Sequence, residues 1–368
     1  MIPEPRRARA AFALSDASAT VTRSGEGEAV IGDDALSVGP VTVSYLDADG
    51  MHAADYHIQM DLWPSGRLAL TQLGRRFETF ARELRRIRNQ ARVAGLLAHG
   101  ITMPEVFSGA LLTTEGARAT ELHVYETHVT VVPEEGDPWQ VPLGALAAVH
   151  LRDDPPGLVL ETATSATLIG LLARQREACH AAIVERRESQ VRFLAELTGQ
   201  SLFSDGQGVA RSKVKGFESL LARFTAPARV AGSAELLAAA TADPRIGFVQ
   251  LLDPDGEPLA SPDALPRDWA AFLLVPVGAR TVLEILAGPS AATYVLRGEI
   301  DALNRDLQTL HFRRAPLALT PEQAVVSPDN PHRLALRKLE PLQRLRASTA
   351  ARVVHSDGWA HSLRAALA

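Results

Sequence analysis

Histidine is the residue type whose ordinary pKa lies closest to neutrality, and its copies are scattered along the 368 residues of this sequence. His123 and His128 lie five positions apart in one predicted strand, 121–132, so the two-residue period of a strand directs them to opposite faces. The run His355-Ser356-Asp357 contains the residue types of a hydrolytic triad, but adjacent residues cannot form that arrangement. We therefore predict no catalytic residue, no metal ligand and no cofactor, and a protein that is not an enzyme.

Two aspartate-rich turns, Asp47-Ala48-Asp49-Gly50 and Asp253-Pro254-Asp255-Gly256, begin like calcium-binding loops. Neither continues to a third ligand and a closing glutamate, so we expect two hairpin turns. The sequence has no glycine-rich phosphate loop. Its single cysteine, Cys179, excludes an intramolecular disulfide and is typical of a buried structural thiol in a reducing compartment.

The densest basic segment is a predicted helix that carries Arg75, Arg76, Arg82, Arg85, Arg86, Arg88 and Arg92. Such a patch could bind an anion or a nucleic acid. It could equally be a solvated helix face, in which Glu78 pairs with Arg82 one turn away. No aromatic residues interleave with the arginines to stack on bases, which favours the solvated face.

The elements that position these residues are repeated along the chain. A turn at Trp63-Pro64-Ser65-Gly66, a strand at 67–73 and a long helix return one hundred residues later, so that Ser65 matches Ser165 and Leu84 matches Val184. On the first helix, apolar residues at spacings of three and four predict one buried face. A weaker third copy follows at 288–310.

We divide the chain into a loose N-terminal lead-in (1–25), a first unit (26–98) that is possibly incomplete, a second unit (102–198), a linker (199–216), a third unit (217–315) and a C-terminal helical tail (316–368). In the second unit, strands are predicted at 106–113, 121–132, 139–143, 146–151, 157–161 and 166–171, before a helix that ends at Leu197. Short strands at such spacing predict an α+β fold of tandem small antiparallel barrels or sandwiches, each capped by a C-terminal helix.

Strands first and one long helix last, in units of this length, resembles the pleckstrin-homology-like fold. The entry into the first helix, Leu70-Thr71-Gln72-Leu73-Gly74-Arg75-Arg76 with Phe80 four residues on, is similar to that of an uncharacterised bacterial family with repeated units of this kind. Many lipid-binding members of the fold carry a basic cluster between their first two strands. Here that loop, 113–119, has only Arg118 beside Glu115, so phosphoinositide binding is disfavoured.

Composition limits the function further. The formal net charge is −5, which gives no global attraction for nucleic acid or anionic lipid. The sequence contains no apolar run long enough to span a membrane, and we expect a cytoplasmic protein. The leading hypothesis is a non-catalytic adaptor or scaffold that binds a protein or peptide, with contacts at Arg75, Arg82, Arg85 and Arg86 on the helix and at Tyr125 and Trp139 beside the groove of the second unit.

Two alternatives stay open. A nucleic-acid or chromatin-associated protein would use the arginine helix, and its binding would weaken steeply with salt. An enzyme of unknown type would need a site between units, for example one that brings His52, His57 and Asp61 together.

Overall fold

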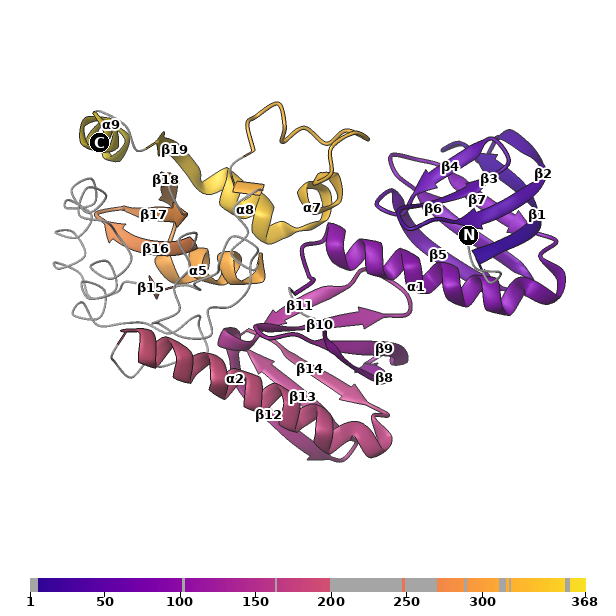
Figure 1. Ribbon diagram of the computed structural model, residues 1–368, viewed down its shortest axis with the longest axis horizontal. Helices are drawn as coiled ribbons and strands as arrows, with labels where there is room; N and C mark the ends of the chain where they lie inside the picture. Colours follow the sequence, from indigo (N-terminus) through magenta and orange to yellow (C-terminus); the bar gives the residue numbers. More distant parts are fainter. Residues whose placement is uncertain are drawn as a thin grey trace.

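The computed structural model describes residues 6–100, 103–162, 164–198, 247–248, 270–287, 290–310, 316–317, 319–354 and 358–368. Within these residues the chain is an α+β protein with three antiparallel sheets (Figure 1). The predicted linker at 199–216, the turn at Asp253–Gly256 and the run at His355–Asp357 lie outside the described residues.

The first sheet has seven strands in the order β4-β3-β2-β1-β7-β6-β5. Their bounds are β1 Arg7–Ser15, β2 Val21–Ile31, β3 Ala35–Val38, β4 Val41–Ser44, β5 Ala48–Ala54, β6 His57–Leu62 and β7 Arg67–Thr71. A short 3-10 turn, Gly74–Arg76, leads into helix α1, Phe77–Gly95. The predicted apolar face of α1 is confirmed, because Phe77, Phe80 and Leu84 are buried in the core of this sheet.

The predicted loose lead-in at 1–25 is wrong over residues 7–25, because these residues form β1, a turn and the first part of β2. Ala8, Ala10 and Phe12 alternate as buried residues along β1, and the strand pairs with both β2 and β7. Alanine has a weak β preference, so this alternation resembled an unstructured alanine-rich segment. The first unit is therefore complete and begins at Arg7.

The second sheet repeats the same order, β11-β10-β9-β8-β14-β13-β12. Its strands are β8 Glu105–Thr113, β9 Gly116–Val124, β10 His128–Pro133, β11 Trp139–Pro142, β12 Leu146–Asp153, β13 Pro156–Thr162 and β14 Ala166–Gly170. A 3-10 turn, Ala173–Gln175, precedes helix α2, Arg176–Thr198. The strand predicted over 121–132 is two strands, since the chain reverses between Val124 and His128 and the two halves pair with each other.

The structural repeat has a period of 99 residues at the junction of sheet and helix, one less than the sequence match indicates. Left-handed backbone conformations recur at Gln72 and Leu171, and the fully buried Leu84 corresponds to the fully buried Ile183 rather than to Val184. A shift of one residue turns a helix by about 100°. The match at one hundred residues therefore aligned similar residue types, but it assigned the buried face of α2 to positions one residue too far along the chain.

The third sheet has five strands in the order β15-β16-β17-β18-β19. The strands are β15 Gly247–Phe248, β16 Ala270–Val277, β17 Arg280–Ala287, β18 Ser290–Arg297 and β19 Thr349–Val354, and the helices of this region are α5 Ile300–Thr309, α7 Arg333–Lys338, α8 Glu340–Ser348 and α9 Trp359–Leu367. The predicted strand and helix of the third copy are confirmed by β18 and α5. The C-terminal tail, predicted as helical, contains α7, α8 and α9, but the prediction omitted β19, which pairs with β18.

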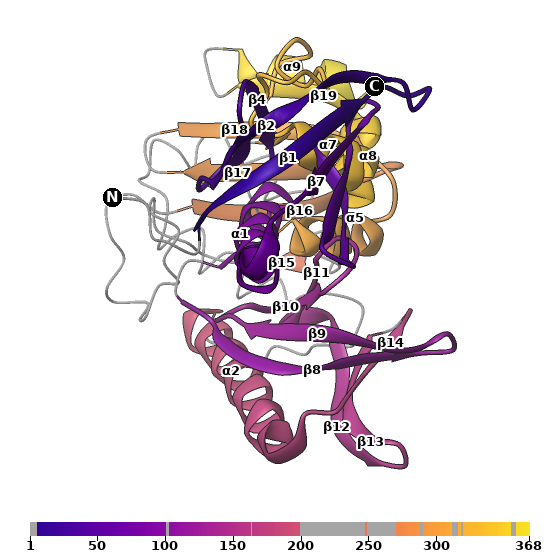
Figure 2. The ribbon, with the colours of Figure 1, turned by 90° about the vertical axis from the view of Figure 1, so that its right-hand side faces the viewer.

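Helix α1 lies between the first two sheets, as Figures 1 and 2 show, with the second sheet and α2 on one side of it and the first sheet on the other. Val93, near the C-terminal end of α1, and Ala98, just after the helix, pack on Val132 of β10. The hydroxyl of Thr130 donates a hydrogen bond to the Ala98 carbonyl, and His128 Nε2 lies 3.1 Å from the same oxygen. One helix thus caps the first sheet and packs against the outer face of the second.

Candidate functional site

The seven arginines predicted to share one helix face are divided among different environments. Arg75 and Arg82 are exposed. Arg85 pairs with Glu134 of the second unit at 2.5 Å, and Arg86 pairs with Glu83 at 2.7 Å. Arg88 and Arg92 are only 2% and 0% exposed. The predicted basic patch is therefore smaller than the sequence indicates, because the turn of the helix carries its last two arginines inward.

Arg88 and Arg92 are held by backbone carbonyls at the start of β5. Arg88 donates from Nη2 to Ala48 O at 2.8 Å, and Arg92 donates from Nη1 to the same oxygen at 2.8 Å. Burial, together with the neighbouring charge of Arg92, lowers the pKa of Arg88 to about 10. Both side chains remain cationic at neutral pH and need negative partners.

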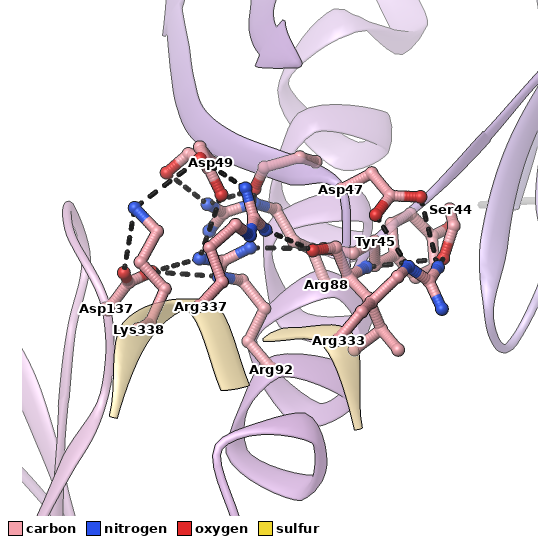
Figure 3. A network of polar contacts seen from close by, with 12 residues as sticks. Ser44, Tyr45, Asp47, Asp49, Arg88, Arg92, Asp137, Arg333, Arg337 and Lys338 are labelled. Atoms are coloured by element: carbon pink, nitrogen blue, oxygen red, sulfur yellow. Dashed lines mark hydrogen bonds and ion pairs between the residues drawn. The ribbon is translucent and has the colours of Figure 1, made fainter. Parts of the chain in front are cut away.

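Two aspartates supply that negative charge from different units (Figure 3). Asp137, in the loop between β10 and β11, accepts hydrogen bonds from Nε of Arg92 at 2.9 Å and from Nη2. Asp49, at the start of β5, lies 3.6 Å from Arg92. The side chain of Arg92 therefore ties the first unit to the second through an ion pair shielded from water.

Helix α7 enters the same region from the C-terminal part of the chain. Arg333 Nε donates to Asp47 Oδ1 at 2.7 Å, and Nη2 donates to Asp47 Oδ2 at 3.0 Å, in a two-pronged contact. Arg337 donates to Asp49 at 2.8 Å and lies 4.9 Å from the ring centre of Trp63. Lys338 lies 3.4 Å from Asp49. We call this set the charged junction: Asp47, Asp49, Arg88, Arg92, Asp137, Arg333, Arg337 and Lys338.

The charged junction explains the turn Asp47-Ala48-Asp49-Gly50. The chain turns at residues 45–47, and residues 48–50 begin β5. The predicted hairpin is wrong, because β4 and β5 lie at opposite edges of the sheet. Both carboxylates bind arginine. In the second unit, β11 and β12 place Ala145 and Ala147 at the corresponding positions, and α5 rather than α7 lies against that turn. The two aspartates that bind arginine at this turn are therefore present in the first unit and absent from the corresponding positions of the second. Among the described residues, no group of three or more histidine, cysteine or acidic side chains is placed to hold a metal ion.

A groove of about 440 Å³ lies between α1 and the outer face of the second sheet. Arg82, Arg85 and Arg86 line it on the helix side. Ser108, Glu121 and His123 line it on the sheet side. The groove is present because α1 contacts β10 near the C-terminal end of the helix, where Val93 packs on Val132. Three of the four arginines predicted for binding thus meet in one place, whereas Arg75 lies outside it.

Charges of opposite sign face each other across this groove. His123 Nε2 lies 2.9 Å from a Glu121 carboxylate oxygen, and this contact, with a smaller contribution from the charge of Arg86, lowers the pKa of Glu121. Arg82 has no ion-pair or hydrogen-bond partner within the described part of the chain. The helix side is therefore positive, the sheet side is negative at Glu121, and one cation is left to bind a ligand.

The other predicted contact residues lie away from the groove. Tyr125 is 6% exposed and stacks on His128 with ring centres 4.7 Å apart. Trp139 is partly buried against the core of the second sheet. Tyr125 packs in the turn between β9 and β10, and Trp139 packs on the core from β11, so neither lines the groove beside α1.

The residues suggested for an enzymatic site share the outer face of the β5–β6 hairpin. His52 lies opposite Gln59, and His57 and Asp61 fall on the same side of β6. All three are exposed, and Asp61 pairs with Arg67 at 3.0 Å. The three side chains therefore lie on a solvent-exposed face of the hairpin.

Sequence reasoning missed Asp137, Arg333 and Arg337. A signal was present, because Arg333 and Arg337 are one helical turn apart, and Glu134, Glu135 and Asp137 form an acidic loop that could neutralise the arginine helix.

Comparison of the sequence with models of protein families and with curated proteins finds no match. No helix in the described ranges has both the length and the apolar character needed to cross a membrane.

Proposed function

We propose that this chain is a non-catalytic adaptor that binds a segment of another protein in the groove between α1 and the outer face of β8, β9 and β10. The observation that carries the proposal is the groove itself. It lies where two units meet, has a volume typical of ligand sites, and is lined by hydrogen-bonding side chains of both charge signs. Such a lining suits a polypeptide, which carries donors, acceptors and charges of both signs.

We further propose that the two seven-stranded units are pleckstrin-homology-like. The strand order β4-β3-β2-β1-β7-β6-β5, its repetition in the second sheet and the helix after each seventh strand support this assignment. The basic cluster of lipid-binding members has no counterpart here, since Arg118 in the β8–β9 hairpin forms an ion pair with Glu115. A protein ligand is therefore favoured over a phosphoinositide.

A nucleic-acid ligand is less compatible with these contacts. Glu83 and Glu134 neutralise Arg86 and Arg85, and Asp137 neutralises Arg92. Phosphate backbones bind through an excess of cations, and carboxylates beside those cations repel them. Only Arg82 in the groove is left without an opposing charge within the described residues.

The proposal is tested by affinity capture from native lysate with the full chain and with two variants, Arg82→Glu inside the groove and Arg75→Glu outside it. Both residues are exposed arginines, so the two substitutions change the net charge by the same amount and have little effect on folding. We expect the wild type and the Arg75→Glu variant to capture one protein partner at low salt, and the Arg82→Glu variant to lose it. Equal capture by all three proteins, or capture of nucleic acid alone, contradicts the proposal.

A further inference from the structure

The groove has a fixed polarity, which limits the ligands that fit it. Its helix wall carries three arginines, and its sheet wall carries Glu121 beside His123. The charge of Arg86 contributes to the lowered pKa of Glu121, so the two side chains are close enough to interact across the opening. A ligand between these walls meets positive charge on one side and negative charge on the other.

The length of the groove is set by α1. The lining residues of the helix extend from Arg82 to Gln90, which corresponds to about 12 Å of helix axis at 1.5 Å per residue. An extended chain advances about 3.3 Å per residue, so about four extended residues cover this distance. A short extended segment matches the groove better than a folded domain would.

An extended segment presents successive side chains to opposite sides. Between one positive and one negative wall, every second residue faces the arginines and the residues between them face Glu121. The complementary pattern is therefore acidic at alternate positions and basic at the positions between them. A segment with the same charges in separate blocks would bring an acidic residue to Glu121 and a basic residue to Arg86.

We infer that the groove binds an extended protein segment of alternating acidic and basic residues, with an acidic side chain on Arg82 and a basic side chain on Glu121, because Arg85 and Arg86 already pair with Glu134 and Glu83. This inference rests on the proposed function and specifies its ligand. Ser108 and Ala119 keep side chains small along the sheet wall, which lets a peptide backbone approach. Arg82, which has no ion-pair partner among the described residues, is the arginine that gains most from an acidic ligand.

The test compares two labelled octapeptides of identical composition by fluorescence anisotropy with the full-length protein. One alternates glutamate and lysine, and the other carries four glutamates followed by four lysines. We expect the alternating peptide to bind at least about tenfold more tightly, because the residues inside the groove can then place an acidic side chain on Arg82 and a basic side chain on Glu121 at the same time. Arg82→Glu is expected to remove about tenfold of this affinity and Glu121→Gln a smaller part, whereas Arg75→Glu leaves it unchanged.

Equal affinities for the two peptides, or binding that Arg82→Glu does not change, overturn the inference. Tighter binding of a single-stranded oligonucleotide than of either peptide also overturns it and moves the arginine helix to nucleic-acid binding. The affinity capture above keeps these failures distinct. A captured partner that depends on Arg82, without preference for the alternating peptide, upholds the adaptor function and rejects only this ligand pattern.

Discussion

At the residue scale, the buried guanidinium of Arg92 is the most consequential side chain of α1. It is fully buried and hydrogen-bonds Asp137, Tyr45 O and Ala48 O, so its removal takes this donor from Asp137 and from the Tyr45 carbonyl, whereas Ala48 O keeps Arg88. We expect Arg92→Met to destabilise the protein by about 3 kcal/mol, at the lower end for broken buried pairs because Asp137 remains partly exposed. Urea unfolding measures this change, and Arg82→Met on the exposed face serves as the control. A midpoint equal to that of the wild type would contradict a structural role for Arg92.

Cys179 gives a residue-scale probe of the second unit. Its thiol is fully buried, and burial, with a smaller effect of Glu105, raises its pKa to about 12. Thiolates are the reactive form, so we expect no modification by a thiol reagent in the native protein at pH 8 and complete modification in urea. Because the chain has one cysteine, a colorimetric thiol assay reports this site alone. Rapid native labelling would show that the core under α2 is open to solvent.

Glu83 makes stability depend on pH. Hydrogen bonds from Arg86 first, and from Arg6 second, lower its pKa below the ordinary value of 4.5. The stabilisation is thus fully present above pH 4.5 and is lost as the pH falls through the lower folded-state pKa. We expect the Tm difference between wild type and Glu83→Gln to shrink from pH 6 toward pH 3. A constant difference over this range would show that Glu83 acts only through packing.

At the scale of elements, the sequence was most informative where the apolar periodicity was strong. It was least informative where the burial of a side chain depends on contacts with other elements. The apolar spacing of Phe77, Phe80 and Leu84 predicted α1 and its buried face, and strand spacing predicted most of the second sheet. Strand β1 was missed because alternating alanines carry little signal. The burial of Arg88 and Arg92 was not predictable from α1 alone, since it depends on Asp137 and on carbonyls of another strand.

The place of β1 in the fold predicts a large effect of a residue in the segment interpreted as a lead-in. Phe12 is 5% exposed in the core of the first sheet. We expect Phe12→Ala to destabilise the first unit by about 3 kcal/mol through loss of apolar burial and the cavity that remains. Val21→Ala on β2, where the side chain is 55% exposed, is the control and should leave the unfolding midpoint unchanged. Equal midpoints for both variants would mean that residues 7–25 contribute little to the fold.

At the scale of the whole molecule, the C-terminal region contacts both seven-stranded units at the same turn. Helix α5 lies against the β11–β12 turn of the second unit, and α7 lies against the β4–β5 turn of the first. The contact of α7 with the first unit is ionic, through Asp47 and Asp49. The contact of α5 with the second unit lacks these carboxylates, because Ala145 and Ala147 occupy the corresponding positions. The two attachments therefore differ in their chemistry, and the attachment of α7 is the one that uses the Asp47 and Asp49 carboxylates.

The attachment of α7 to the first unit combines apolar packing with the Arg333–Asp47 contact. Leu334 is fully buried and approaches α1 at Gly95, where a Cβ atom would lie 3.0 Å from Leu334 Cδ2. Arg333 is 8% exposed as a side chain and holds Asp47 with two hydrogen bonds, so Arg333→Ala leaves Asp47 without its main partner. We expect amide hydrogen exchange over 333–338 to accelerate by at least about tenfold, because local opening of α7 becomes easier by more than 1.4 kcal/mol.

Exchange in β16 to β18 should stay unchanged in the Arg333→Ala variant, and Arg297→Ala at the exposed end of β18 should leave α7 unchanged. The double variant Asp47→Arg with Arg333→Asp reverses the pair and should restore part of the protection, as a double-mutant cycle requires of a direct interaction. If Arg333→Ala leaves exchange at α7 unaltered, Leu334 and Arg337 hold the helix without Arg333. The ionic contact would then set only the register in which α7 meets the first unit.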